Sequence, residues 1–128
     1  MFENSKPFSG FSVDDIDAAR RFYTETMEVD VREEAGMLQL QIRPDVAVLV
    51  YPVETHRPGS YTVLNFPVDD IDAAVALLES RGVTFERYDG APQDDKGVVR
   101  GLSTDMGPDI AWFKDPAGNV LSVLQESA

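Results

Sequence analysis

Two pairs of adjacent carboxylates are the first residues in this chain whose types and spacing could do acid–base chemistry. The seven-residue segment VDDIDAA occurs twice, and it places the acidic pairs 14–15 and 69–70 at matching points. Two carboxylates that share a site can divide the roles of general acid and general base. A repeat of this length in so short a chain also indicates an internal duplication.

Each acidic pair stands where a strand pattern changes to a helix pattern. Apolar residues alternate along 11–13, as in a half-buried strand, and then recur at helical spacing over 16–27. We expect Asp14 to cap this helix, with Asp17 as the acid three residues on, because carboxylates accept hydrogen bonds from the N–H groups of the first turn. The second copy repeats the change, and Gly82 is expected to end its helix. Two capped helices are therefore favoured over a paired-carboxylate catalytic site.

Each half of the chain has the pattern of one strand, one helix and three further strands. The further strands are expected over 29–34, 37–42 and 46–51 in the first half and over 83–88, 109–114 and 119–125 in the second, with DPAG at 115–118 as a hairpin turn. Proline and glycine indicate a linker over 55–60. The sequence thus predicts an α+β fold of two βαβββ modules, 1–54 and 61–128, in one compact domain.

Two such modules, with V-x-D-I-D-A-A-x-x-F-Y early and D-P-A-G-N late, resemble the vicinal oxygen chelate superfamily of glyoxalases, bleomycin-resistance proteins and dioxygenases. The resemblance extends from about Phe8 to about Gln125. It implies a curved mixed sheet around a cleft, the glyoxalase/bleomycin resistance-like fold. It is a specific signal for the fold and a weak one for activity, because this fold hosts many chemistries.

In the metal enzymes of this superfamily, four places on the inner face of the sheet carry a histidine or an acid. Carried over onto this sequence, those places fall on Phe8, Leu49, Val63 and Ser122. Hydrocarbon side chains offer no donor atoms, and a single hydroxyl cannot hold a divalent ion. We therefore expect no metal and no cofactor. The only histidine, His56, is expected in the solvated linker.

The residues around those four places give a prediction of the cleft lining. Strand alternation sends second neighbours to the same face, and the last hairpin adds two further side chains. The predicted ligand-binding residues are Phe8, Ser12, Leu49, Tyr51, Val63, Asn65, Ile110, Trp112 and Ser122. Gln39 and Gln41 could face the same way. A mostly apolar lining with a few hydrogen-bonding groups favours a small organic molecule. The alternative is that Phe8 and Trp112 fill the hollow, which would leave a structural or interaction module.

The segment 89–107 is long and shows little strand pattern. Connections of this length in a compact domain are often functional flaps, so Asp94, Asp95 and Lys96 could meet a ligand; the alternative is a solvated loop.

Composition narrows the classes of partner. A formal net charge of −12 repels phosphate backbones and anionic lipids and would help to recruit a cationic compound, so neither nucleic acid nor a membrane is expected as a partner. No apolar run is long enough to span a bilayer, the first residues do not resemble a signal peptide, and there is no cysteine; we expect a cytoplasmic location. Homodimers are expected from the resemblance, because sheets of this superfamily commonly complete clefts or bury edges against another copy.

The function predicted from the sequence is binding of a small drug-like or metabolite molecule without the usual metal ligands. One alternative is a metal-independent lyase or isomerase that uses Tyr51, Asp94 or Lys96 as acid or base. The other is a metal-dependent enzyme of lyase, isomerase or dioxygenase type whose ligands stand elsewhere.

Overall fold

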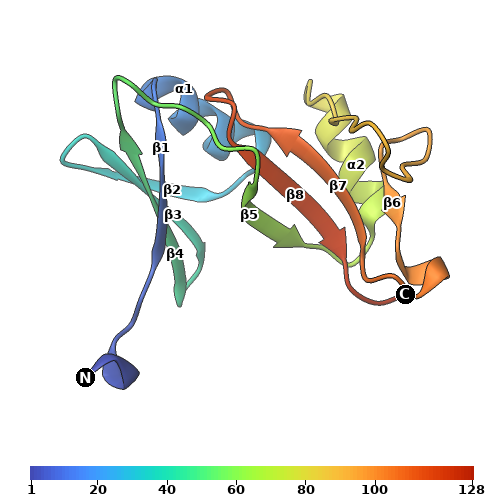
Figure 1. Cartoon of the computed structure of the whole chain (residues 1–128). Coiled ribbons are helices and arrows are strands. Elements are labelled where there is room, and N and C mark those ends of the chain that lie inside the picture. The colour runs from blue at the N-terminus through green and yellow to red at the C-terminus, as the bar shows by residue number, and fades with distance from the viewer. The chain divides into compact units, whose positions relative to one another are not determined.

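The computed structural model describes all residues, 1–128, and divides them into two units, Met1–Arg57 and Pro58–Ala128 (Figure 1). Each unit contains a four-stranded mixed sheet, and each has the expected order of strand, helix and three strands. The prediction of two βαβββ modules is therefore confirmed. The grouping of the two modules into one compact domain stays a prediction.

The first unit builds its sheet in the order β1-β4-β3-β2. Its elements are η1 (Phe2–Asn4), β1 (Ser9–Val13), α1 (Ile16–Arg21), the π-helical turn η2 (Phe22–Thr26), β2 (Asp30–Glu34), β3 (Met37–Arg43) and β4 (Val46–Pro52). β1 is parallel to β4, and the other pairs are antiparallel. Because a parallel pair needs a crossover connection, the chain between β1 and β4 has room for the helix and the β2–β3 hairpin.

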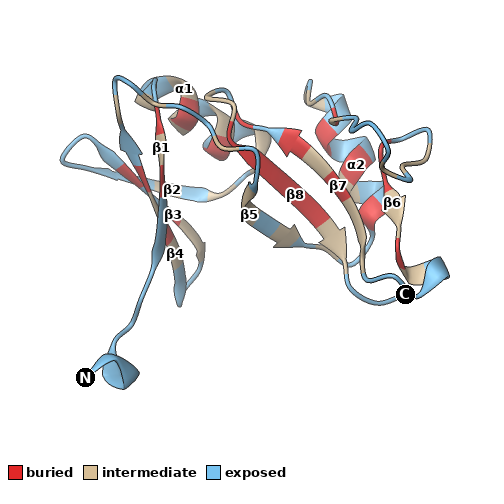
Figure 2. Cartoon of the chain, viewed as in Figure 1, coloured by how far each residue is buried: buried red, intermediate tan, exposed pale blue.

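One face of this first sheet is buried. Alternate residues along the strands are almost fully covered, together with Ala19 and Tyr23 from the helical segment; the strand residues are Phe11, Val13, Leu38, Leu40, Val48 and Val50 (Figure 2). The rings of Phe11 and Tyr23 lie 6.2 Å apart. The opposite face carries the intervening residues, which are half-buried or exposed, and it is this face that the predicted site residues share.

The second unit orders its strands β5-β8-β7-β6. Its elements are β5 (Thr62–Pro67), α2 (Ile71–Ser80), β6 (Val99–Arg100), η3 (Leu102–Thr104), β7 (Asp109–Lys114) and β8 (Val120–Gln125). Four successive residues of β8, 120–123, are buried, as expected for a central strand (Figure 2). α2 contributes the buried residues Ile71, Val75 and Leu78. No helix of either unit is both long and apolar enough to cross a membrane.

The repeated acids cap helices, although the first cap is one residue later than predicted. Asp15, rather than Asp14, accepts hydrogen bonds from the N–H groups of Asp17 and Ala18. Asp14 instead accepts from the N–H of Asp15. The cap falls on Asp15 because that residue is still extended and the helix begins at Ile16. Asp70 caps α2 in the same way through the N–H of Ala73.

The strand predicted over 83–88 is absent. Glu86 N–H does donate to Trp112 O at 2.8 Å, so this segment touches the open edge of β7. Farther along that edge, however, Ile110 and Asp109 are paired with Val99 and Arg100 of β6. The edge of β7 is thus shared between two segments, and neither 83–88 nor β6 forms a long ladder.

The DPAG turn forms as predicted, and a buried carboxylate holds it. Asp115 is only 4% exposed, and its side chain accepts from Ala117 N–H, Asn119 N–H and the Asn119 side-chain amide. Gly118 N–H closes the turn on Asp115 O, with Gly118 at φ 86°, a region that favours glycine.

We expect Asp115→Ala to lower the free energy of unfolding by about 2–4 kcal/mol, because it removes the buried carboxylate that accepts three hydrogen bonds from Ala117 and Asn119. Asp45→Ala, in an exposed turn of the first unit, should change it by no more than about 0.5 kcal/mol. Urea unfolding followed by far-UV circular dichroism measures both. Equal effects of the two substitutions would contradict this role for Asp115.

Candidate ligand-binding surfaces

The open face of the first sheet brings together three of the predicted site residues, Ser12, Leu49 and Tyr51. The register pairs Ser12 with Tyr51, and Gly10 with Leu49, which in turn pairs with Gln39. Residues opposite each other in a sheet point to the same side, so these side chains share one face. A Cβ at Gly10 would lie 3.2 Å from the Leu49 carbonyl oxygen, which is tighter than an ordinary contact, so glycine suits the close approach of β1 to β4.

A groove of about 420 Å³ lies on this face. Its lining residues are Phe8, Glu34, Ala35, Met37, Gln39, Ala47, Val48 and Leu49. The lining is mostly apolar, with one carboxylate and one amide. Phe8 and Leu49 were predicted from the sequence, and Gln39 and Ala47 follow from the same alternation. Met37 was missed, although it precedes Gln39 at the same spacing on β3, and the hairpin residues 34–35 gave no signal.

Phe8 stands at the rim of this groove and does not plug it. The residue precedes β1 and is 72% exposed, in an arm that leads away from the sheet (Figure 1). It also borders a neighbouring hollow of about 740 Å³ that includes Lys6, Gln41 and Val46. A side chain that fills a cavity would be buried, so the first unit keeps an open apolar groove.

His56 lies closer to the predicted site than the sequence indicated. The expectation was a solvated loop residue, but the side chain is half-buried and its Nδ1 lies 2.6 Å from Ser12 Oγ. The reason is a turn after β4: Val53 N–H donates to Val13 O, and His56 N–H donates to Val53 O. This turn folds the chain back over the end of β1 and places an imidazole beside a serine hydroxyl.

The second unit carries a row of three predicted residues. Asn65, Ser122 and Trp112 are direct neighbours across β5, β8 and β7. Ser122 is fully buried, and its hydroxyl donates to Asn65 Oδ1 at 2.5 Å. Asn65 is exposed and Trp112 half-buried, so the row presents an amide and an indole on either side of a buried hydroxyl.

Two further predicted residues of this unit are placed less simply. Ile110 pairs with Leu124 two positions from Trp112 and is half-buried. Val63 lies where the register between β5 and β8 shifts, between Thr62 and Leu64, and has no partner position on β8. Alternation counted from the sequence cannot anticipate such a shift.

Tyr88 extends the row and was not predicted as a site residue. Its ring packs edge-on against Trp112, with centroids 5.6 Å apart, and remains 40% exposed. Burial raises the pKa of the Tyr88 hydroxyl, and the charge of Glu86 adds to this, so the phenol is neutral near neutral pH. No sequence signal places Tyr88 here, because the contact depends on the irregular path of 83–88 along β7.

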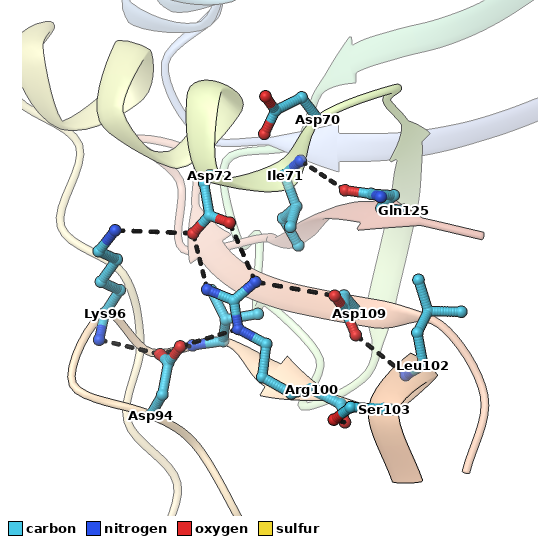
Figure 3. Close-up of polar contacts among 12 residues, drawn as sticks. Asp70, Ile71, Asp72, Asp94, Lys96, Arg100, Leu102, Ser103, Asp109 and Gln125 are labelled. Atoms are coloured by element: carbon cyan, nitrogen blue, oxygen red, sulfur yellow. Dashed lines mark hydrogen bonds and ion pairs between the residues drawn. The ribbon is translucent and has the colours of Figure 1, made fainter. Parts of the chain in front are cut away.

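Of the three charged residues of the segment 89–107 that could have met a ligand, Asp94 and Lys96 are engaged by neighbouring residues. Asp94 accepts from Lys96 N–H, Val98 N–H and Arg100, and Lys96 Nζ lies 3.6 Å from Asp72 (Figure 3). A carboxylate held by this many donors is a weak base. Asp94 and Lys96 are therefore structural partners within this segment rather than a free acid or base.

The four places that hold metal in enzymes of this fold do not offer a fitting donor set here. Phe8, Leu49 and Val63 have only carbon and hydrogen beyond the backbone, and the hydroxyl of Ser122 is bonded to Asn65. No group of three or more histidine, cysteine, aspartate or glutamate side chains is arranged to hold a metal ion.

The chain is similar to several solved structures over nearly its whole length. TnmS3, an antibiotic-binding protein from Streptomyces sp. CB03234, is 28% identical with a TM-score of 0.66, covering 97% of this chain and 98% of that one. A glyoxalase family protein from Enterococcus faecalis is 20% identical with a TM-score of 0.69, covering 97% and 99%. The fosfomycin resistance protein FosX from Listeria monocytogenes is 11% identical with a TM-score of 0.68, covering 93% and 90%. The last two likenesses show the fold alone.

Curated protein sequences gave no match to this chain. The family model of the Glyoxalase/Bleomycin resistance protein/Dioxygenase superfamily, in contrast, matches residues 9–123. That span runs from the first residue of β1 into β8 and includes both copies of VDDIDAA. The chain therefore belongs to the glyoxalase/bleomycin resistance protein/dioxygenase superfamily.

Proposed function

We propose that this protein binds and sequesters a small, largely apolar organic molecule without the help of a metal ion. The observation that carries the proposal is the open groove of about 420 Å³ in the first unit, lined mostly by hydrocarbon and including two of the four places where relatives of this fold hold metal. Pockets for drug-sized ligands occupy roughly 300–1,000 Å³ and have linings of this kind. The likeness to an antibiotic-binding protein at 28% identity supports the same class of ligand.

The groove of the first unit offers binding energy mainly through apolar contact. Phe8 and Met37 expose large hydrophobic side chains at its edge, and burial of such surface is worth about 25 cal/mol per Å². Gln39 and Glu34 are the polar groups that could orient a ligand there. The groove thus favours a ligand with an extended hydrocarbon or aromatic surface and few charges.

The row on the second unit offers a complementary kind of contact. Trp112 and Tyr88 are two rings against which a planar molecule can pack, either stacked on a ring face or in edge-to-face contact. Asn65 Oδ1 is engaged by Ser122, so its Nδ2 group is the one left to bond a ligand oxygen. The two surfaces are separate candidate sites for a ligand, and each is tested by its own substitution.

The proposed setting is a cytoplasmic homodimer. A chain without cysteine suits a reducing compartment, and the acidic net charge would favour the approach of a cationic compound by steering. The native mass of the purified protein, measured beside the binding experiments, tests the dimer.

Binding can be measured with Nile red, a neutral planar dye, and with displacement of the dye by a panel of antibiotics and metabolites. We expect Leu49→Asp to weaken dye or ligand binding by about tenfold or more, because it puts a charge into apolar contact. The matched control is Leu77→Asp, an exposed leucine of α2 outside both surfaces, which should leave binding unchanged. Tyr88→Leu makes the equivalent test of the second unit. Flat titrations for the dye and every compound class would refute the proposal.

Metal removal should leave binding intact. We expect the dissociation constant to be the same before and after dialysis against a chelator, and elemental analysis to find far less than one equivalent of nickel, zinc, iron or manganese. A stoichiometric metal whose removal abolishes binding would instead support the metal-dependent alternative.

The bond between Ser12 and His56 favours a second candidate function, a metal-independent enzyme acting on a carbonyl compound. Serine and imidazole 2.6 Å apart are within reach for proton transfer, and Tyr51 is the direct neighbour of Ser12 across the sheet. In this candidate, His56 takes a proton from the carbon next to the substrate carbonyl and returns it to the neighbouring carbon, while the hydroxyls of Ser12 and Tyr51 donate hydrogen bonds to the carbonyl oxygen.

For this second candidate we expect turnover of a carbonyl substrate such as the hemithioacetal of a 2-oxoaldehyde to survive chelator and to fall by about 10²–10⁴-fold in His56→Gln, because the base is removed. Tyr51→Phe should reduce kcat less. Product formation followed by nuclear magnetic resonance is the measurement. No turnover by the wild-type protein, or turnover that His56→Gln leaves unchanged, would exclude this candidate.

A further inference from the structure

Arg100 joins three carboxylates from different parts of the second unit (Figure 3). Its guanidinium donates to both oxygens of Asp72, at 2.6 and 3.1 Å, and its Nε donates to Asp94 Oδ2 at 2.9 Å. Asp109 Oδ2 lies 3.7 Å away. Asp72 belongs to the first turn of α2, Asp94 to the segment before β6, and Asp109 to the start of β7. One side chain of β6 therefore ties the long connection to a helix and to a strand.

The bond to Asp72 has the geometry of a strong ion pair. A two-pronged arginine–carboxylate contact fixes orientation as well as distance, which a single exposed ion pair does not. Hydrogen bonding from Arg100 lowers the pKa of Asp72, and the charges of Arg100 and Lys96 act in the same direction. Arg100 itself is two-thirds covered, so this contact is only partly screened by solvent.

Asp94 links the Arg100 side chain to the backbone of residues 96–98. Its Oδ1 accepts from Lys96 N–H and Val98 N–H, both at 2.9 Å, and its own N–H donates to Val98 O. Partial burial acts to raise the pKa of Asp94, but the hydrogen bonds from Val98 N–H, Arg100 and Lys96 N–H outweigh it and lower the pKa. The carboxylate thus stays charged near neutral pH and holds residues 94–98 in a tight turn.

Gln93, the residue before this turn, is hydrogen-bonded to the backbone of Tyr88, which together with Trp112 forms the aromatic row of the second unit. Its side-chain amide donates to Glu86 O and Gly97 O, both at 2.9 Å, and its Oε1 accepts from Tyr88 N–H at 2.8 Å. Arg87 adds contacts to the carbonyls of Asp94 and Asp95. The backbone of Tyr88 is therefore fixed by the folded segment, and the Tyr88 ring packs on Trp112.

We propose that Arg100 is a positioning residue for ligand recognition: through Asp94 and Gln93 it holds Tyr88 against Trp112 and so sets the shape of the aromatic row. This proposal rests on the proposed binding function. The ligands it selects are planar molecules that stack on one ring and meet the edge of the other, because the two rings are tilted by 69°. The segment 89–107 is then neither a flap nor a loose loop but the support of Tyr88.

The rival explanation is that Arg100 stabilises the fold and has no influence on the row. A double-mutant cycle separates the two, because residues that act through one another have non-additive effects. If Arg100 acts through Tyr88, its substitution costs affinity only while Tyr88 is present. A purely structural role would lower stability without this dependence.

The experiment compares Arg100→Gln, Tyr88→Leu and the double variant, with Arg43→Gln as the matched control on an exposed arginine of the first unit. Trp112 is the only tryptophan, so near-UV circular dichroism and acrylamide quenching report its surroundings directly. We expect Arg100→Gln to change both signals and to weaken Nile red binding by about threefold to tenfold. Tyr88→Leu should have a similar effect on binding, with no further loss in the double variant, while Arg43→Gln matches the wild-type protein.

Additive losses of affinity, or a folded Arg100→Gln whose Trp112 signals and affinity are those of the wild-type protein, would overturn the proposal. If Arg100→Gln does not fold, Asp94→Asn replaces it, because it removes the charge facing Arg100 but keeps an oxygen for the two N–H groups. Failure of the wild-type protein to bind the dye or any compound counts against the proposed function, whereas the tryptophan signals still decide whether Arg100 positions Tyr88.

Discussion

The parallel pairing of β1 with β4, and of β5 with β8, is the constraint on which both candidate surfaces depend. In each unit it joins the first strand to the last, so that residues far apart in the sequence become direct neighbours. Gly10 meets Leu49 and Asn65 meets Ser122 through this pairing alone. A shift of the strand register by one residue would turn the buried side chains to the opposite face. Burial of alternate residues such as Phe11 and Val50 disfavours that shift.

The lack of metal-binding side chains on these paired strands changes what the two surfaces can bind, from a metal ion to an organic molecule. Of the four places at which metal enzymes of this fold hold an ion, Leu49 and Ser122 lie at paired positions of these strands. In this chain the groove of the first unit brings together hydrocarbon from Phe8 and Leu49, and the pairing of β5 with β8 brings together Ser122 and Asn65, whose hydroxyl and amide are hydrogen-bonded. Burial of an organic ligand against apolar side chains lowers the free energy of the complex, whereas the same side chains offer no donor atoms to a divalent ion.

The sequence predicted the modules and most strands because hydrophobic periodicity and helix caps are local signals. The helix starts were predicted to within one residue, at Asp15, and the DPAG turn in full. What it could not predict depends on non-local competition: the edge of β7 is divided between two segments, and the contact of Tyr88 with Trp112 follows from that division. His56 was missed for a similar reason, because only the turn after β4 carries it back to Ser12.

The two modules differ most in the connection between the helical segment and the second strand. In the first unit only residues 27–29 separate η2 from β2. In the second unit the corresponding stretch is long, and a long segment loses more conformational entropy on ordering. Arg100 and Arg87 supply charged and backbone contacts along this segment that offset part of that cost. The long segment is therefore ordered by specific contacts, and it supports Tyr88. Tyr88 adds a second ring to a surface on which the strands alone place only Trp112.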